Sequence, residues 1–299
     1  MPSSQSAKKS AVTATDQRYI VPGLERGLKL LQLFDRGRTV LGAAEVARAL
    51  EVPRSSAFRL IQTLEYLGYL ERTGNDYRLG PAVLRLGFEY VAALPITELA
   101  RPILANLRDE CGCTAQLALR DQREVVYVMH VLGPSHFSSN VSVGTRLPVH
   151  ATALGRMFLA YMSDQAISAL YAGSTLQRFS NRTTITVNGL IERAHADRAR
   201  GVAISESHFE AGISAIAAAV LDGHAVPVAA LSITLLQPAL PATPQAEHLI
   251  DAVRNAAAEL SHRLNYRAQP LVAPMAGDRA ARSHANGRSA LGDTLIHRA

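Results

Sequence analysis

The sequence of 299 residues is poor in cysteine and in aromatic residues. Cysteine occurs only at Cys111 and Cys113, tryptophan is absent, and aromatic residues make up 5% of the chain. Two cysteines separated by a single residue are unsuited to a disulfide framework, and a structural zinc site would need further ligands. We therefore expect no disulfide framework, no structural zinc and a reducing, cytoplasmic location.

The sequence also lacks any long apolar run. No window approaches the roughly 18 consecutive apolar residues of a membrane-spanning helix, and the polar start MPSSQSAKKSAVTATDQ has no apolar region of the secretory type. Hydrophobic residues make up 48% and charged residues 19% of the chain, which is typical of a soluble globular protein. A membrane is therefore not an expected partner, and the length predicts about two domains.

Positive charge is concentrated at the two ends of the chain. The net charge is +6; residues 1–80 hold 12 Lys and Arg against 8 Asp and Glu, and residues 267–299 hold 5 against 2. The middle of the chain, residues 81–266, is nearly neutral with 14 against 15. A basic N-terminal segment joined to a neutral body is typical of a protein that binds a polyanion through one part only.

Residues 18–80 have the pattern of three helices and a β-hairpin. The spacing predicts a helix from Pro22 with the apolar face Leu24, Leu28, Leu31 and Phe34, a helix over 43–50, a helix from Pro53 to Leu67, and two strands around the turn at 73–76. Pro53 suits the first turn of the third helix, and Gly68 suits the residue just beyond its end. This order predicts a winged helix-turn-helix DNA-binding domain, preceded by a disordered lead at 1–17.

The third predicted helix has an apolar face and a polar face. The apolar face is expected to pack in the core and consists of Ala57, Leu60, Ile61, Leu64 and Leu67. DNA contacts are expected from the polar face and from the hairpin, through Arg54, Ser55, Ser56, Arg59, Thr63, Arg72 and Arg78. Phe58 fits either face, and we favour a place in the core. The alternative is a small helical domain with a solvated basic face.

Residues 81–96 are expected to form a linker helix, and residues 97–266 a second domain of the α+β class. Its predicted helices cover 97–110, 153–161, 165–170, 190–200 and 246–264, and its predicted strands cover 114–119, 124–131, 138–143, 215–221 and 226–234. Short strands joined by tight turns favour an antiparallel sheet. The composition of residues 267–299 predicts a disordered basic tail.

The segment from Gly144 to Arg156 is the most informative part of the second domain. An extended, turn-rich stretch leads into a helix for which Thr152 is a suitable N-cap. The N–H groups of Ala153, Leu154 and Gly155 would then face the space before the helix, where a small carboxylate could bind without any lysine. The alternative is that Thr152 caps the helix and nothing binds there.

Three runs of residues resemble the IclR-type family of bacterial transcriptional regulators. The run AAEVARALEVPRSSAFRLIQTLEYLGYLERTGNDYRLG is similar to the family's DNA-binding half, and VGTRLPVHATALGRMFLAYM and GVAISESHFEAGISAIAAAVLDGHAVPVAALSIT are similar to its effector domain. The resemblance covers about residues 20–265, with the motifs in the family's order. It implies a winged helix-turn-helix, a linker helix and a GAF-like effector-binding domain with a curved antiparallel sheet.

The resemblance also implies a pocket for a small organic or aromatic carboxylate. Matched position by position, and together with Thr152 and Gly155, the pocket would include Ala153 and Leu154 at the helix start, Ser205 on the loop after Gly201, Ala215 on one strand, and Ser232 and Thr234 on another. Relatives that bind small polar acids often have Asp at the position of Ser205 and Cys at the position of Ala215. The smaller or uncharged residues here favour a roomier pocket and an aromatic or larger acid.

Two groups of histidine, cysteine and acidic residues have the chemistry of a metal or redox site. Cys111 and Cys113 could sense oxidation or hold zinc with His130 or His150, but two clear further ligands at close spacing are missing. The cluster Glu206, His208 and Glu210 is more typical of a solvated loop. We therefore expect no metal site and no cofactor.

Other single residues have weaker support. His150, next to the predicted helix start, could bind an effector carboxylate, although a lone histidine is more often structural. Ser142 and Ser214 lie outside any nucleophile motif, so no catalytic residue is expected.

The residues and the resemblance together predict a ligand-responsive DNA-binding regulator of a catabolic operon, either a repressor or an activator. We expect a palindromic double-stranded operator and a homodimer or a dimer of dimers, because one recognition helix reads only a few base pairs. The apolar residues of the linker helix that a partner chain could cover are Val83, Leu84, Leu86, Phe88 and Val91. The alternatives are an effector-independent DNA-binding protein and, with less support, an enzyme in the C-terminal domain.

Overall fold

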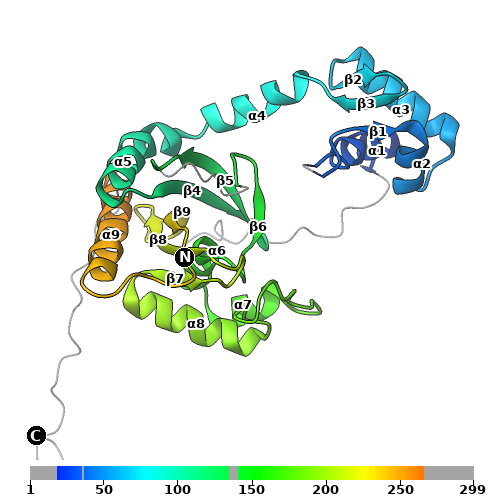
Figure 1. The fold of residues 1–299 in the computed structure, drawn as a ribbon. Helices are drawn as coiled ribbons and strands as arrows, with labels where there is room; N and C mark the ends of the chain where they lie inside the picture. The colour runs from blue at the N-terminus through cyan, green and yellow to red at the C-terminus, as the bar shows by residue number, and fades with distance from the viewer. Residues whose placement is uncertain (1–18, 36, 135–140, 266–299) are drawn as a thin grey trace, which may run out of the picture.

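The computed structural model describes residues 19–35, 37–134 and 141–265, with a small N-terminal part and a larger C-terminal part joined by helix α4 (Figure 1). The N-terminal part contains α1 (Pro22–Leu31), β1 (Leu41–Gly42), α2 (Ala43–Ala49), α3 (Arg54–Tyr66), β2 (Leu70–Thr73) and β3 (Asp76–Leu79). The linker α4 spans Ala82–Ala92. The predicted disordered segments 1–17 and 267–299 lie outside the described residues.

The N-terminal part is a winged helix-turn-helix, as predicted. β1, β3 and β2 form an antiparallel sheet in that order, and β2 and β3 are the predicted hairpin. Ala57 and Ile61 of α3 are buried in one core with Leu30 of α1 and Tyr77 of β3. Gly68 has φ +76° just after α3, a conformation that glycine adopts without strain, and there the chain turns toward β2.

Four apolar side chains of the N-terminal part lie differently from the expectation. Leu24 and Leu28 of α1 are exposed, and Leu30 is the buried residue of that helix. Leu67 and Phe58 are also exposed, so the prediction that they pack in the core is wrong. The reason is the small size of the domain, whose core covers only a narrow strip of each helix.

The C-terminal part is built on a six-stranded antiparallel sheet in the order β6-β5-β4-β9-β8-β7. The strands are β4 (Thr114–Asp121), β5 (Glu124–Val131), β6 (Arg146–Pro148), β7 (Ala203–Glu206), β8 (Ser214–Leu221) and β9 (Pro227–Leu235), and the helices are α5 (Pro95–Cys111), α6 (Ala153–Leu159), α7 (Asp164–Leu170), α8 (Val187–Arg200) and α9 (Gln245–Arg263). The sheet is curled, with α5 and α9 against one face and α6, α7 and α8 on the other (Figure 1). The predicted α+β class and curved antiparallel sheet are confirmed.

Alternation along β8 and β9 sorts their side chains onto the two faces of the sheet. Ile216, Leu231 and Ile233 pack in the core with α5 and α9, whereas Ala217 and Ala230 pack in the core with α6. The face toward α6 therefore carries small side chains. Because alanine and serine fill little volume, this face leaves room for a cavity next to α6.

Two strands of the C-terminal part differ from the prediction. The strand expected at 138–143 falls partly outside the described residues, and positions 141–143 are not in a strand. The edge strand next to β5 is instead β6. Ser205, expected on the loop after Gly201, lies in β7 and pairs with Ala215 of β8. A strand as short as β7 shows too few alternations to be recognised from its sequence.

Candidate functional site

One side of α3 stands clear of the N-terminal core. The helix begins at Arg54, with Pro53 as the residue before it rather than within its first turn. The residues on the side away from Ala57 and Ile61 form what we call the recognition face: Arg54, Ser55, Phe58, Arg59, Gln62 and Thr63, all exposed. Ser56 is half-buried beside them. Phe58, expected in the core, therefore lies among the predicted DNA-contacting residues.

The arginines give the recognition face its charge. Neither Arg54 nor Arg59 has a hydrogen-bond acceptor or an acidic partner within the described part of the chain. Arginine stays charged at physiological pH, and its planar group matches both phosphate and the edge of guanine. Thr63 differs, because its hydroxyl donates to the carbonyl oxygen of Arg59 at 2.8 Å. Within the described residues, the two arginines thus keep all their side-chain donors for a polyanion.

The hairpin adds two further exposed arginines, and both have contacts of their own. Arg72 donates through Nε to the carbonyl oxygen of Gly74 at 3.0 Å, within the turn between β2 and β3. Arg78 forms an ion pair with Glu71 at 2.8 Å. Exposed ion pairs are weak in water, so a phosphate can compete with Glu71 for Arg78.

A cavity of about 70 Å³ lies between α6 and the sheet. This volume is several times the ~10–15 Å³ that one water molecule occupies. The lining residues are Gln116, Tyr127, Val141, Leu147, Thr152, Ala153, Leu154, Ser205, Phe209, Glu210, Ile213, Ala215, Ser232 and Thr234. Seven of the eight residues expected to bind the effector are among them, and Gly155 is the exception. We call this space the effector cavity.

Gln116 of β4 is the polar centre of the cavity wall, and it was not singled out from the sequence. Its Oε1 accepts hydrogen bonds from the hydroxyls of Ser232 at 3.1 Å and Thr234 at 3.0 Å. The side chain is buried, and its amide nitrogen has no acceptor within the described residues. A single polar residue in an otherwise apolar stretch of strand was the available signal.

The start of α6 is arranged differently from the expectation. Thr152 is the N-cap, as predicted: its Oγ1 accepts the N–H of Gly155 at 3.1 Å, and its hydroxyl donates to the carbonyl oxygen of Pro148 at 3.0 Å. The N–H of Gly155 is therefore already used. A Cβ at Gly155 would lie 2.3 Å from the backbone of Val149, so the glycine permits close packing and does not contact the cavity.

The charge of the effector cavity is low. Among the described lining residues only Glu210 is charged, and it is exposed. Burial raises the pKa of Tyr127 well above its usual range, so this phenol stays neutral. Because the hydroxyls of Ser232 and Thr234 already donate to Gln116, the Gln116 amide nitrogen is the donor that would hold an anion here, in place of a cation.

The remaining single candidates have structural contacts. His150 is buried, its Nε2 lies 2.9 Å from the carbonyl oxygen of Gln177, and it is absent from the cavity lining. Burial raises the pKa of the Cys111 thiol to about 12 and also raises that of Cys113, so both thiols stay protonated. Ser214 donates its hydroxyl to the carbonyl oxygen of Gln237 at 2.7 Å.

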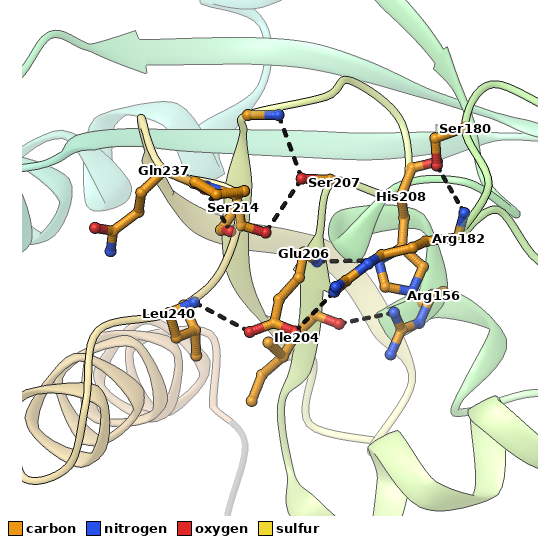
Figure 2. A network of polar contacts seen from close by, with 12 residues as sticks. Arg156, Ser180, Arg182, Ile204, Glu206, Ser207, His208, Ser214, Gln237 and Leu240 are labelled. Atoms are coloured by element: carbon orange, nitrogen blue, oxygen red, sulfur yellow. Dashed lines mark hydrogen bonds and ion pairs between the residues drawn. The ribbon is translucent and has the colours of Figure 1, made fainter.

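A polar network surrounds the outer edge of β7 (Figure 2). Arg156 of α6 makes a buried ion pair with Asp197 of α8 at 2.6 Å, and it donates to the carbonyl oxygen of Ile204 at 2.9 Å. The backbone N–H of Glu206 donates to Nδ1 of His208 at 2.9 Å.

In the part of the chain that the structure describes, no group of histidine, cysteine and acidic residues could hold a metal ion. No helix in this part is long and apolar enough to cross a membrane.

Family models match both parts of the chain. The model of the bacterial transcriptional regulator IclR C-terminal domain matches residues 88–262, and the model of the IclR helix-turn-helix domain matches residues 23–74. The two matches cover the recognition face and the effector cavity.

Three curated proteins with similar sequences are named as regulators. The Pca regulon regulatory protein of Pseudomonas putida is 30% identical over 212 residues, which are 71% of this chain and 73% of the relative. The p-hydroxybenzoate hydroxylase transcriptional activator of Acinetobacter baylyi is 29% identical over 249 residues, 80% of this chain and 90% of the relative. The transcriptional repressor IclR of Escherichia coli is 27% identical over 231 residues, 76% of this chain and 84% of the relative.

Solved structures show the same architecture. A transcriptional regulator from Rhodococcus sp. RHA1 has a TM-score of 0.71 and 31% identity, covering 82% of this chain and 98% of that chain. An IclR homologue from Microbacterium hydrocarbonoxydans, solved in complex with 4-hydroxybenzoate, has a TM-score of 0.70 and 26% identity, covering 81% of this chain and 98% of that chain.

Proposed function

Because the chain belongs to the IclR family of bacterial DNA-binding transcriptional regulators, we propose that it controls a catabolic operon in response to an aromatic carboxylate. The acid binds in the effector cavity, and the recognition face binds the operator. One observation carries the effector part of the proposal: the hydroxyls of Ser232 and Thr234 hold the oxygen of the Gln116 amide, which leaves its nitrogen as a donor on the cavity wall. The relatives named above are regulators rather than enzymes.

The lining of the cavity suits a carboxylate on a flat apolar body. Ligand sites are mostly apolar with a few placed polar groups, and this cavity pairs Gln116 and its hydroxyl partners with Tyr127, Leu147 and Phe209. The amide nitrogen of Gln116 is a donor without an acceptor among the described residues, so a carboxylate oxygen would satisfy it. Helix α6 contributes less than the sequence indicated, because Thr152 occupies the N–H of Gly155.

Two lines of support favour an aromatic acid over a two-carbon acid. The Pca regulon regulator and the p-hydroxybenzoate hydroxylase activator carry names from aromatic catabolism, and the Microbacterium homologue was solved with 4-hydroxybenzoate. The small residues Ser205 and Ala215 face each other across β7 and β8 on the cavity wall. A small uncharged side chain at each position leaves space and adds no charge to repel the acid.

The operator part of the proposal rests on Arg54 and Arg59 of the recognition face, with Arg72 and Arg78 on the hairpin. We propose a palindromic site bound by a homodimer or a dimer of dimers in the cytoplasm, where the bacterial chromosome lies. Helix α4 supplies a surface for a second copy. Its side chains Leu84, Leu86, Phe88 and Tyr90 are 56–71% exposed, and no residue of this described helix is buried.

Calorimetric titration of the full-length protein tests the effector assignment. Wild type is titrated with 4-hydroxybenzoate, benzoate and glyoxylate, and so is the Ser205→Asp variant, which places a carboxylate on the cavity wall. The matched control is Ser163→Asp, because Ser163 only caps α7 and aspartate is an equally good cap. We expect the aromatic acids to bind more tightly than glyoxylate, and Ser205→Asp to weaken them at least about tenfold by like-charge repulsion.

A footprint on the DNA upstream of the protein's own gene completes the test. The acid that binds in the titration is expected to change the strength or extent of the protected region. Tighter binding of glyoxylate than of benzoate would overturn the aromatic assignment. A footprint that no acid changes, together with no binding in the titration, would favour an effector-independent DNA-binding protein.

A further inference from the structure

A second hollow lies at the outer edge of β7. Its volume is about 560 Å³, and its lining residues come from the segment before α8, from α8, from β7 and the residues after it, and from the segment before α9: Asn181, Arg182, Arg193, Arg200, Ile204, Glu206, His208 and Leu240. We call this hollow the arginine cleft. Successive side chains of a strand point to opposite sides, so Ser205 lines the effector cavity while its neighbours line the cleft. The two sites are therefore separate.

The arginines of the cleft carry more positive charge than their partners neutralise. Arg193 has no hydrogen bond and no ion pair within the described residues. Arg182 lies 3.3 Å from Glu206 (Figure 2), and Arg200 lies 4.0 Å from an Asp197 oxygen that Arg156 also contacts. Burial and the neighbouring charge of Arg156 lower the pKa of Arg193. Unpaired like charges held together favour the binding of an anion.

His208 adds a hydrogen-bond donor that lacks an acceptor among the described residues. Its side chain is 8% exposed, and Figure 2 shows the imidazole beside Arg156. Because Nδ1 accepts the N–H of Glu206, the proton of the neutral ring is on Nε2. Nε2 is buried and has no partner within the part of the chain that the structure describes. A negatively charged acceptor in the cleft lined by arginines would satisfy this N–H.

The protonation state of His208 follows from its surroundings. Burial and the charges of Arg156, Arg193 and Arg182 lower its pKa to about 4. The imidazole is therefore neutral at physiological pH, and it adds a donor to the cleft without adding charge. The acidic side chains nearby are Glu206 and Asp197, and both already contact arginines.

We propose that the arginine cleft binds a phosphate group, in the form of a phosphate monoester, through Arg182, Arg193, Arg200 and the Nε2–H of His208. A phosphate monoester has three terminal oxygens and close to two negative charges at neutral pH. It can accept from several guanidinium groups and from the imidazole at the same time. A carboxylate has two oxygens in one plane and one charge, which leaves part of these donors unpaired.

Calorimetry with the full-length protein tests the proposal, with inorganic phosphate as the probe. Each titration is made at constant ionic strength with chloride as the balancing ion. Arg193→Gln removes the charge of a half-buried side chain that has no ion pair in the described part of the chain, and we expect it to weaken phosphate binding about tenfold or more. The matched control is Arg263→Gln on α9, which removes the same charge from an exposed ion pair with Glu259. It is expected to bind phosphate like the wild type.

The variant His208→Asn tests the Nε2–H donor while keeping the hydrogen bond that stabilises the fold. Asparagine can still accept the N–H of Glu206 through its side-chain oxygen, but it has no group at the place of Nε2. We expect thermal unfolding close to that of the wild type and phosphate binding weakened several-fold. Binding of 4-hydroxybenzoate is measured on the same variants and is expected to stay unchanged, because the effector cavity is a different site.

Three results would overturn the assignment. The first is the absence of saturable phosphate binding in the wild type. The second is an equal loss of affinity in Arg193→Gln and Arg263→Gln, which would show an effect of net charge alone. The third is binding of the dicarboxylate malonate as tightly as phosphate, which would show that the cleft takes carboxylates.

Discussion

The recognition face of α3 and the effector cavity beside α6 are both assigned to negatively charged partners, yet their side chains differ in charge and in exposure. The recognition face carries Arg54 and Arg59, which are exposed and have no partner among the residues that the structure describes. Among the described residues that line the cavity, the only charged one is Glu210, and the polar centre is the buried, neutral Gln116. On the proposed assignment, the two sites would therefore bind partners of the same charge through different side-chain chemistries.

The difference follows from the solvent around each site. At an exposed surface, water and ions screen each charge, so binding a polyanion requires several cations and gains from the release of counterions. Inside a cavity, a neutral donor is enough, because a hydrogen bond to an ion is strong where water is excluded. A cation in the cavity would attract many anions, whereas an amide donor held in one position favours an anion whose shape reaches it.

Salt is expected to separate the two sites most clearly. If six phosphates are contacted, operator affinity should fall about 10³-fold between about 50 and 200 mM salt. The affinity for 4-hydroxybenzoate should change less than about twofold, because a buried site is screened little. Fluorescence anisotropy with a labelled operator and calorimetry with the acid measure the two slopes. Equal slopes would contradict the comparison.

Breaking the buried ion pair should destabilise the C-terminal part, which contains the effector cavity, and leave the recognition face intact. Asp197→Ala leaves the charge of Arg156 buried and unpaired, and we expect a loss of about 3–5 kcal/mol in the free energy of unfolding of the C-terminal part. Urea unfolding followed by circular dichroism measures it. The control is Asp251→Ala, which removes an exposed pair with Arg254 and should cost less than about 1 kcal/mol. Similar losses in both variants would show that burial of the pair matters little.

Removing one arginine of the recognition face should weaken operator binding and leave the effector cavity unaffected. Arg59→Ala is expected to weaken operator binding by about 1–3 kcal/mol and to leave the affinity for 4-hydroxybenzoate unchanged. Arg263→Ala on α9 serves as the control for net charge. Electrophoretic mobility shifts with the footprinted operator give the affinities. Unchanged operator binding in Arg59→Ala would move the DNA contacts away from this face.

Acid should act on the C-terminal part through His208. The folded-state pKa of His208 is lowered to about 4, below its ordinary value, so the unfolded chain binds the proton more readily. Stability contributed by the neutral ring is therefore present above the ordinary pKa and is lost as the pH falls toward 4. We expect His208 to account for about 1 kcal/mol of lost stability between about pH 7 and 5.5.

Urea unfolding of wild type and His208→Asn at the two pH values isolates this contribution. The variant should lose less stability than the wild type on acidification, because its side chain does not titrate. An identical pH dependence in both proteins would assign the loss to other groups.

Much of the fold was predictable from spacing, because the helices and long strands carry enough apolar residues to show their period. The boundaries of β5 and the order of the three N-terminal helices and the hairpin agree with the prediction, whereas the two-residue strand β1 was not predicted. The failures have physical causes. β7 has only four residues, and Phe58 has an apolar side chain on a side of α3 that the small core does not cover.

The sequence predicted most of the effector cavity's expected lining residues but missed its polar centre. Seven of its residues came from the family resemblance and the helix start, and all seven line one cavity. Gly155 does not line it. In a sequence, a glycine needed for close packing cannot be distinguished from one needed for ligand approach. Gln116 was missed because its role depends on Ser232 and Thr234, which are more than 110 residues away in sequence.

The network around Arg156 and His208 also has a consequence for how copies of this protein associate. An open sheet edge invites strand pairing with another chain, which is a route to aggregation. At the β7 edge, the carbonyl of Ile204 is bonded by Arg156 and the N–H of Glu206 by His208, so two of its pairing groups are already used. At the opposite edge, β6 has only three residues. The occupied groups of β7 and the shortness of β6 both disfavour edge-to-edge strand pairing between copies of the chain.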